Sequence, residues 1–253
     1  MKKMDIPQDL MVSLLSEVID SKTPEEKQAA MLTLGTLPVE STKSTFDKLL
    51  AKLEKGTLPP EIRLELTDAI DSTKSEELLT RLEQAQVGSS DSVSLLASYQ
   101  DCLYGGDPEQ GQQLVFRHST AQCMKCHAYD DYGGNAGPRL NGIAGHLSRE
   151  QILEAIVNPS ARIAPGYGIV TLKLKDGETI SGILQKENDS EVTIKVGNQP
   201  EKAIAKSEIE EQTTAPSSMP NMTSYLTKKE IRNIVSFLST LHGDEMQASS
   251  VTD

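Results

Sequence analysis

The sequence predicts a mainly α-helical protein, in which a helical-repeat-like domain precedes a second α-helical domain with a small β-insertion. Apolar residues recur at helical spacing, between recognisable helix starts and stops, through most of the 253 residues. Only the stretch at about 168–214 alternates apolar and polar residues as strands do. The length suits two domains, and the glycine pair Gly105-Gly106 marks their boundary. We therefore expect domains at 1–104 and 105–245, followed by a disordered tail at 246–253.

The first domain is predicted to consist of short amphipathic helices in succession. Thr23-Pro24-Glu25-Glu26 provides an N-cap hydroxyl, a proline at the first helical position and a glutamate that can complete a capping box. The pattern Leu-Leu-x-x-Leu-Glu occurs at 49–54 and again at 78–83, which indicates an irregular HEAT-like repeat. We expect no chemistry here, because the methionines lie in apolar stripes. Further helix starts are predicted near Ser44, Pro60 and Ser75.

The second domain is expected to open with a helix at Asp107-Pro108-Glu109-Gln110, which again supplies an N-cap and a proline at the first helical position. Ser148 begins a later helix, and Thr227 begins the last one with a capping box. Between these two helices, Asp176-Gly177 is typical of a hairpin turn that joins two alternating runs. Further strands are predicted at 191–196 and within 202–212.

Composition excludes two classes of partner. The formal net charge is −12, and no run of five basic residues occurs, which argues against nucleic-acid binding. Aromatic residues make up only 4% of the chain, so a surface that stacks on bases is not expected. No stretch approaches the roughly 20 apolar residues that a membrane span needs. The acidic residues are spread along the chain and indicate a solvated surface.

Cys123-Met124-Lys125-Cys126-His127 is the most informative stretch, because C-x-x-C-H is the attachment pattern of a covalent c-type haem. Two thiols at this spacing can add to the two vinyl groups of one porphyrin, and the adjacent histidine can take an axial position on the iron. A thioredoxin-like dithiol and half of a zinc site are the alternatives. A zinc site needs further ligands, and the remaining cysteine and histidines are scattered. These residues are Cys102, which we expect to be a small buried side chain, and His118, His146 and His242.

A candidate for the second axial position lies in Ser218-Met219-Pro220, in a loop before the last predicted helix. A methionine thioether is a soft ligand for haem iron, and Pro220 stiffens the backbone beside the Met219 side chain. We expect Met222 to pack at the edge of the pocket, and His118 or His146 would be the donor in an alternative bis-histidine site. The glycine-rich run 133–140 would let the backbone pass close to a flat ligand.

The order of helix, C-x-x-C-H, Gly-Pro-x-Leu, helix, Met-Pro loop and terminal helix resembles a class I cytochrome c. The stretch 102–243 is most similar to the planctomycete- and verrucomicrobial-type haem-binding domain. In that family, the domain often follows HEAT-like repeats and a sugar-dehydrogenase-like propeller. The likeness is based on Gly105-Gly106-Asp107, Pro165-Gly166-Tyr167-Gly168, the β-insertion and Ser218-Met219-Pro220.

The resemblance implies one covalent haem c. Thioether links would form at Cys123 and Cys126, with His127 as the proximal iron ligand and Met219 as the distal one. Tyr167 and Arg139 lie near the pocket residues in sequence, and on that ground alone we expect them to approach the propionates.

The resemblance also implies the surroundings of this haem. Pro138 would orient the His127 imidazole through its backbone carbonyl, and Leu140 would pack on the porphyrin. Phe237 in the last helix would cross the first helix of the domain at Gly111. The family usually has an aromatic residue four positions after that glycine, whereas this chain has Val115 there, followed by Phe116.

These residues predict an electron-transfer protein more than an enzyme, because histidine and methionine together fill both axial positions of the iron. A dehydrogenase, fused or docked, would be the electron donor, and another electron carrier would be the acceptor. Because covalent haem addition follows export in bacteria, we expect a periplasmic protein. The chain shows no signal peptide, since no apolar region follows Met1-Lys2-Lys3, so it is expected to be the C-terminal part of a longer exported protein, such as a larger dehydrogenase.

Two other functions remain open from the sequence. A displaceable sixth ligand would make the protein a haem-based sensor, ligand binder or peroxidase-like catalyst. Alternatively, the N-terminal helices would be a protein-interaction scaffold that carries the haem domain as cargo. In that case, deletion of residues 1–100 would leave the haem spectrum intact.

Overall fold

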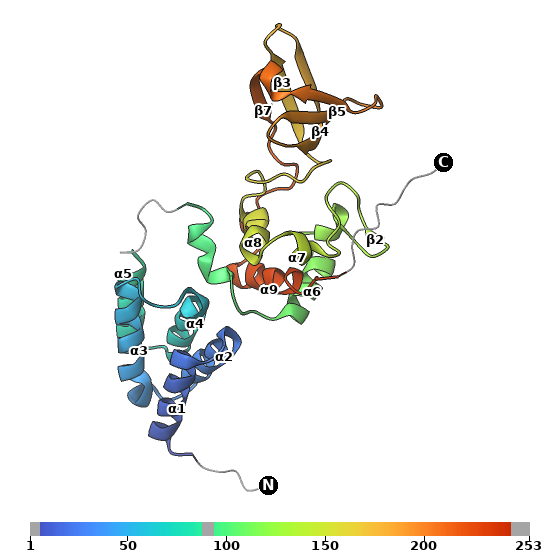
Figure 1. Cartoon of the computed structure of the whole chain (residues 1–253). Helices are drawn as coiled ribbons and strands as arrows, with labels where there is room; N and C mark the ends of the chain where they lie inside the picture. The colour runs from blue at the N-terminus through green and yellow to red at the C-terminus, as the bar shows by residue number, and fades with distance from the viewer. Residues whose placement is uncertain (1–5, 88–93, 244–253) are drawn as a thin grey trace. The chain divides into compact units, whose positions relative to one another are not determined.

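The structure is a computed structural model that describes residues 6–87 and 94–243, so the predicted tail at 246–253 lies outside the described residues. The chain divides into two compact units. Figure 1 labels its helices and strands. The first comprises Met1–Leu114 and Leu226–Thr240, and the second comprises Val115–Tyr225 and Leu241–Asp253.

Helices make up most of the regular structure, and a five-stranded sheet makes up most of the rest. The coarse prediction of a mainly helical protein with a β-region is therefore confirmed. The predicted boundary between residues 104 and 105 lies inside the first unit, because that unit extends to Leu114. The last helix of the chain belongs to the first unit too. None of the helices in the described ranges is both long and apolar enough to cross a membrane.

The first unit begins with helices whose apolar faces share one core. The largest fully buried side chains include Met31, Phe46 and Leu66. Gly35 follows the second helix so closely against Ala69 that a Cβ atom there would lie 2.6 Å from the Ala69 Cα. This close approach packs the second helix on α4. The elements are α1 (Gln8–Ser21), α2 (Pro24–Leu34), α3 (Val39–Glu54), η1 (Pro60–Ile62), α4 (Arg63–Thr73) and α5 (Glu76–Val87).

Local signals placed most of these boundaries, and two predictions were wrong by several residues. Thr23 and Glu26 form the predicted capping box at the start of α2. The helix expected from Ser44 instead begins at Val39, where the buried Thr42 hydroxyl donates to the Pro38 carbonyl over 3.3 Å. Pro60 opens a short 3₁₀ turn, and the α-helix starts only at Arg63.

The remaining elements of the first unit are η2 (Ala97–Cys102), the first part of α6 (Pro108–Arg117) and α9 (Lys228–Leu238). The Asp107 carboxylate caps α6, and Thr227 and Glu230 form the predicted capping box of α9. A Cβ atom on Gly111 would overlap the Asn233 carbonyl oxygen and lie 2.8 Å from the Phe237 Cβ. The predicted crossing of these two helices at Gly111 is confirmed.

The second unit contains short elements around the C-x-x-C-H motif. Ser148 caps α8 through a hydrogen bond from the Gln151 amide, as predicted. A two-stranded hairpin directly after the motif was not expected, because strands of two residues leave no periodic pattern. The elements are η3 (Cys123–Lys125), β1 (Ala128–Tyr129), β2 (Tyr132–Gly133), α7 (Ile143–His146), α8 (Arg149–Val157) and η5 (Met222–Ser224).

The predicted β-insertion is one antiparallel sheet with the order β6-β5-β4-β3-β7. Figure 1 labels β3, β4, β5 and β7 of this sheet. Val170 and Leu172 point to its core with Val192 and Ile194, as the alternation predicted. The final strand returns to pair with the first, with Val170 opposite Thr214. The elements are β3 (Ile169–Leu174), β4 (Thr179–Glu187), β5 (Glu191–Lys195), β6 (Lys202–Ala205), η4 (Lys206–Glu208) and β7 (Ile209–Thr214).

Candidate functional site

The C-x-x-C-H motif forms a single tight turn. Gln122 takes a left-handed conformation with φ of 47° and reverses the chain just before η3. The amides of Cys126 and His127 both donate to the Cys123 carbonyl, over 3.2 and 3.0 Å. The turn therefore gathers both thiols and the imidazole within one loop of backbone.

The two thiols differ in exposure. Cys126 is exposed and Cys123 is partly buried, and both are free cysteines. Burial raises the pKa of the Cys123 thiol, and the neighbouring Cys126 adds to the rise. Cys123 is therefore a neutral thiol at neutral pH. Within the described ranges, no group of three or more histidine, cysteine, aspartate or glutamate side chains is arranged to hold a metal ion.

The His127 ring is held in one orientation by a backbone carbonyl. Its Nδ1 atom lies 2.7 Å from the Pro138 carbonyl oxygen. A carbonyl oxygen only accepts hydrogen bonds, so Nδ1 carries the proton and donates it. In the neutral imidazole, the Nε2 atom then keeps its lone pair, which is the state that a metal ligand requires. The predicted contact between Pro138 and His127 is confirmed.

Gly137 packs directly against the same ring. A Cβ atom at this position would lie 2.8 Å from the His127 Cε1 and 3.0 Å from Nδ1. Real Cβ atoms essentially never come as close as 2.8 Å, so any other residue here would push the imidazole away from the Pro138 carbonyl. The Gly137 amide also donates to the Cys126 carbonyl over 2.8 Å, which anchors the loop to the motif.

The other two glycines of the loop also pack on the motif. The Gly134 amide donates to the carbonyls of Met124 and His127, over 2.9 and 3.2 Å. A Cβ atom on Gly133 would overlap the His127 carbonyl oxygen, and Gly133 has φ of 111°. We expected these glycines to bring backbone close to a flat ligand. In the structure, their close neighbours are the backbone of the motif and the imidazole.

Residues on either side of the loop extend this framework. Leu140 is 8% exposed, and its amide donates to the Ala128 carbonyl over 2.8 Å. Asn141 was missed by sequence reasoning. Its Oδ1 accepts from the Asp130 amide over 2.8 Å, and its Nδ2 donates to the Asp130 carboxylate over 2.7 Å. Asp130 has φ of 50°, a left-handed conformation in which aspartate and asparagine are enriched. An aspartate at this position is therefore the sequence signal that could have marked this turn.

Aromatic side chains fasten the β1–β2 hairpin to the end of α6. The Phe116 ring meets the edge of Tyr129 at 5.6 Å and stacks on Tyr132 at 6.3 Å between centroids. Val115, which stands where the resembling family has an aromatic residue, is 2% exposed. Phe116 thus packs on the motif's own hairpin, while Val115 fills the core position.

The two candidate methionines occupy different surroundings. The Met219 amide donates to the Ser217 hydroxyl over 3.1 Å, and the Ser217 amide donates to the Ser160 hydroxyl over 3.1 Å. The Met219 side chain is partly buried in this extended loop. Met222 begins η5 and is only 4% exposed, so its predicted packing role is confirmed. The Met219 amide is thus bonded to Ser217, which is bonded in turn to Ser160. The other predicted site residues come together around the motif; they are Cys123, Cys126, His127, Pro138 and Leu140.

The other residues considered from the sequence make different contacts. His118 uses Nδ1 to accept from the amides of Thr120 and Ala121, which shapes the loop before Cys123. His146 ends α7 and is exposed. The Arg139 guanidinium contacts the Asp130 carbonyl, and Tyr167 is 40% exposed. Cys102 is fully buried, as predicted.

No protein-family model matches this chain, and no curated protein is significantly similar to it.

Proposed function

We propose that this protein is an electron-transfer c-type cytochrome. One haem c is attached through Cys123 and Cys126, with His127 and Met219 as axial ligands. The hydrogen bond from His127 Nδ1 to the Pro138 carbonyl, at 2.7 Å inside a C-x-x-C-H turn, is the observation that supports this function best. It prepares Nε2 as a metal ligand beside two thiols at the C-x-x-C sequence spacing that is typical of haem attachment.

Each residue of the turn has a physical task in this proposal. The Pro138 carbonyl keeps the proton on Nδ1 and increases the basicity of Nε2. Gly137 leaves the imidazole room to reach that carbonyl. Two thiols in one turn hold a ligand at two points, which removes its freedom to dissociate or rotate. Haem supplies a reversible one-electron couple when it is bound. Met219 would hold the haem iron through its thioether, which would favour the reduced state and exclude substrates.

The wider assignment follows from that role. Residues 105–245 would be a cytochrome c-like domain with an inserted sheet, and the helices α1–α5 a HEAT-like array. A dehydrogenase donates the electron and another carrier accepts it, in the periplasm, where covalent haem attachment takes place. The net charge of −12 favours a partner with a basic surface.

Co-expression with a haem-attachment system tests the proposal. The purified protein should gain the mass of one haem that survives denaturation, with both thioethers on the peptide that contains Cys123 and Cys126. Replacing both cysteines with alanine should abolish the covalent adduct. The matched control is Cys102→Ala, since the third cysteine is fully buried and should leave both thioethers intact. Free thiols at both motif positions in the matured protein would reject the proposal.

The second axial ligand needs its own test, because Met219 is partly buried in a loop and Met222 lies three residues away. Met219→Ala should abolish the sulfur-to-iron charge-transfer band of the oxidised protein, and Met222→Ala should retain it. Carbon monoxide should not bind the reduced wild-type protein at neutral pH. Rapid carbon monoxide binding would favour the alternative of a sensing or peroxidase-like haem with a displaceable ligand.

A further inference from the structure

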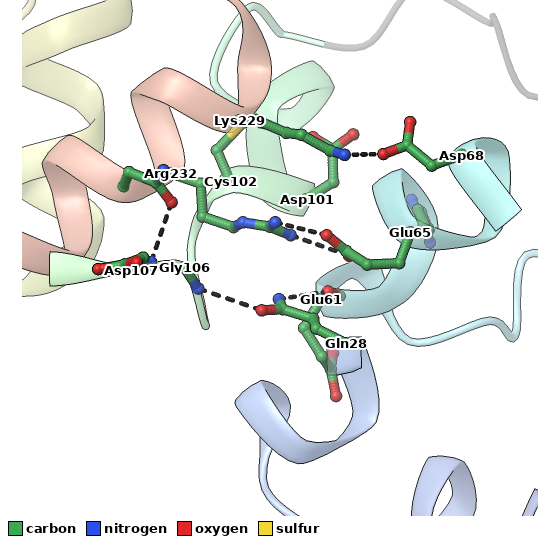
Figure 2. Close-up of polar contacts among 12 residues, drawn as sticks. Gln28, Glu61, Glu65, Asp68, Asp101, Cys102, Gly106, Asp107, Lys229 and Arg232 are labelled. Carbon is green, nitrogen blue, oxygen red and sulfur yellow. Dashed lines mark hydrogen bonds and ion pairs between the residues drawn. The ribbon is translucent and has the colours of Figure 1, made fainter. Parts of the chain in front are cut away.

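A buried ion pair joins the last helix to the N-terminal helices within the first unit. The Arg232 guanidinium on α9 donates to both carboxylate oxygens of Glu65 on α4, over 2.9 and 2.5 Å (Figure 2). The side chains are 6% and 1% exposed. A bidentate pair of this kind has one favourable geometry, so it fixes the alignment of the two helices.

The Gln28 side chain makes a second connection, from α2 to the segment before α6. Its Nε2 donates to the carbonyls of Glu61 and Tyr104, over 2.7 and 3.2 Å. Its Oε1 accepts from the Gly106 amide over 3.1 Å (Figure 2). Gln28 is 7% exposed, and these bonds satisfy a buried amide that would otherwise be costly.

Further contacts surround these two. Lys229 on α9 forms an ion pair with Asp68 on α4 (Figure 2). Lys228 binds the Asp101 carboxylate over 2.8 Å. The Asp107 amide donates to the Asn233 side chain over 2.9 Å, which ties the start of α6 to α9.

The energetics of the central pair show what kind of contact this is. Burying two charges costs desolvation energy, which their attraction repays only when both partners are in place. The Arg232 Nε atom is buried and has no hydrogen-bond partner within the described residues. Loss of Glu65 would therefore leave the guanidinium without compensation in the core. We therefore expect this interface to stay assembled, because separating the two helices would take Glu65 and Arg232 away from the partner that compensates each charge.

We infer that α9 is permanently docked on α1–α5, and that Glu65, Arg232 and Gln28 form the lock that selects this docking. The face of α9 that carries Arg232 therefore binds the helical array α1–α5 of the same chain. The array is thus a structural part of the protein and not a scaffold that carries the haem domain as separable cargo. Within the first unit, the array is bonded to the segment before α6 through Gln28 and Gly106, and to α9 through Glu65 and Arg232. The inference rests on the first unit alone and does not depend on haem.

Hydrogen exchange on the full-length chain tests the lock through Glu65→Gln. This change removes the charge that compensates Arg232 at nearly constant volume. Amides of α4 and α9 should exchange together and about a hundredfold faster, and the melting temperature should fall by about 10 °C. The matched control is Glu77→Gln, which removes an ion pair with Lys43 whose side chains are 69% and 43% exposed. It should leave exchange in α9 unchanged.

Two further variants keep the test decisive if Glu65→Gln fails to fold. The double variant Glu65→Leu with Arg232→Met removes both charges, and it should restore slow exchange in α9 because a matched apolar pair replaces the ion pair. Gln28→Ala is a milder change and should speed exchange at Gly106 and in α9 about tenfold. Faster exchange confined to α1–α5 in every variant, with α9 unaffected, would overturn the inference.

Discussion

At His127, a single carbonyl oxygen decides which ring nitrogen is available to a metal. The Pro138 carbonyl accepts a hydrogen bond from Nδ1, and Gly137 leaves the space in which the ring can make this contact. The family resemblance pointed to Pro138, and the glycine-rich composition of the loop predicted a close approach of the backbone to a flat ligand. The structure shows that Gly137 serves the imidazole directly. The neighbours of Gly137 could not be predicted from the sequence, because they depend on how the loop folds back on the C-x-x-C-H turn.

Gly137→Ala should disturb this arrangement. The added methyl group would lie 2.8 Å from the His127 Cε1 and displace the ring from the Pro138 carbonyl. We expect a loss of about 1–3 kcal/mol of stability and a smaller share of molecules with covalent haem. Thermal unfolding and intact-mass analysis measure these two effects.

The matched control is Gly145→Ala in α7, where a Cβ atom meets nothing within 4 Å. This helical position should gain up to about 1 kcal/mol and keep full haem attachment. Equal behaviour of the two variants would show that the ring is not held by packing at Gly137.

Helices and strands were predicted best where the signal is local. The capping boxes predicted at Thr23 and Thr227, and the helix start predicted at Ser148, each depend on residues within four positions of one another, and all three are present. The alternation around Val170 likewise predicted the buried face of β3. The start of α3 was misplaced because Pro38 offers no side-chain cap, although its carbonyl accepts from the Thr42 hydroxyl.

The crossing of α6 and α9 depends on the absence of a side chain at Gly111. Gly111→Ala would drive a methyl group into the Asn233 carbonyl, so the two helices must move apart. We expect a loss of about 1–3 kcal/mol in the unfolding free energy, measured by urea denaturation. Gln112→Ala on the exposed side of α6 should change the unfolding free energy by less than about 0.5 kcal/mol. A tolerated Gly111→Ala would mean that the helices do not cross this closely in solution.

The sheet contains a pH-dependent contact at Glu187. Hydrogen bonds from Lys206 and Gln212 hold the pKa of the Glu187 carboxyl below its ordinary value of 4.5. A carboxyl whose pKa is lowered by folding stabilises the protein above its unfolded pKa, and the gain disappears as the pH falls through the lowered value. Glu187→Gln should therefore be less stable than wild type at pH 7, by under about 1 kcal/mol because the pair is partly exposed.

Urea denaturation at pH 7 and pH 3 measures this difference, which should shrink or vanish at the lower pH. Glu201→Gln, an exposed glutamate before β6, is the control and should show no such trend. A gap between wild type and Glu187→Gln that persists unchanged at pH 3 would contradict the assignment.

On the scale of the whole chain, sequence reasoning found the order of elements but not the long-range contacts. It anticipated a helical region, a C-x-x-C-H turn, a β-insertion and a last helix. It did not anticipate that Arg232 pairs with Glu65, because two charges separated by 167 positions leave no local pattern. The placement of Met219 relative to His127 is likewise a prediction. The structure shows the Met219 amide bonded to the Ser217 hydroxyl.

The inserted sheet should be removable without loss of the rest. Its first and last strands are neighbours, with Val170 opposite Thr214 and the Ala215 amide bonded to the Ile169 carbonyl over 2.9 Å. Paired antiparallel strands lie about 5 Å apart, so a linker of two or three residues can replace 169–214. The shortened protein should retain the capacity to attach haem and the unfolding transition of the first unit. Loss of either would show that the sheet supports the site.

The pairing of Glu65 with Arg232 also limits how such a chain can be recombined. A chimera that took its N-terminal helices from one parent and its final helix from another would inherit one half of a charge pair, with nothing to neutralise it. Crossovers between these two positions are therefore expected to be rare among viable variants, unless the carboxylate and the guanidinium are exchanged together.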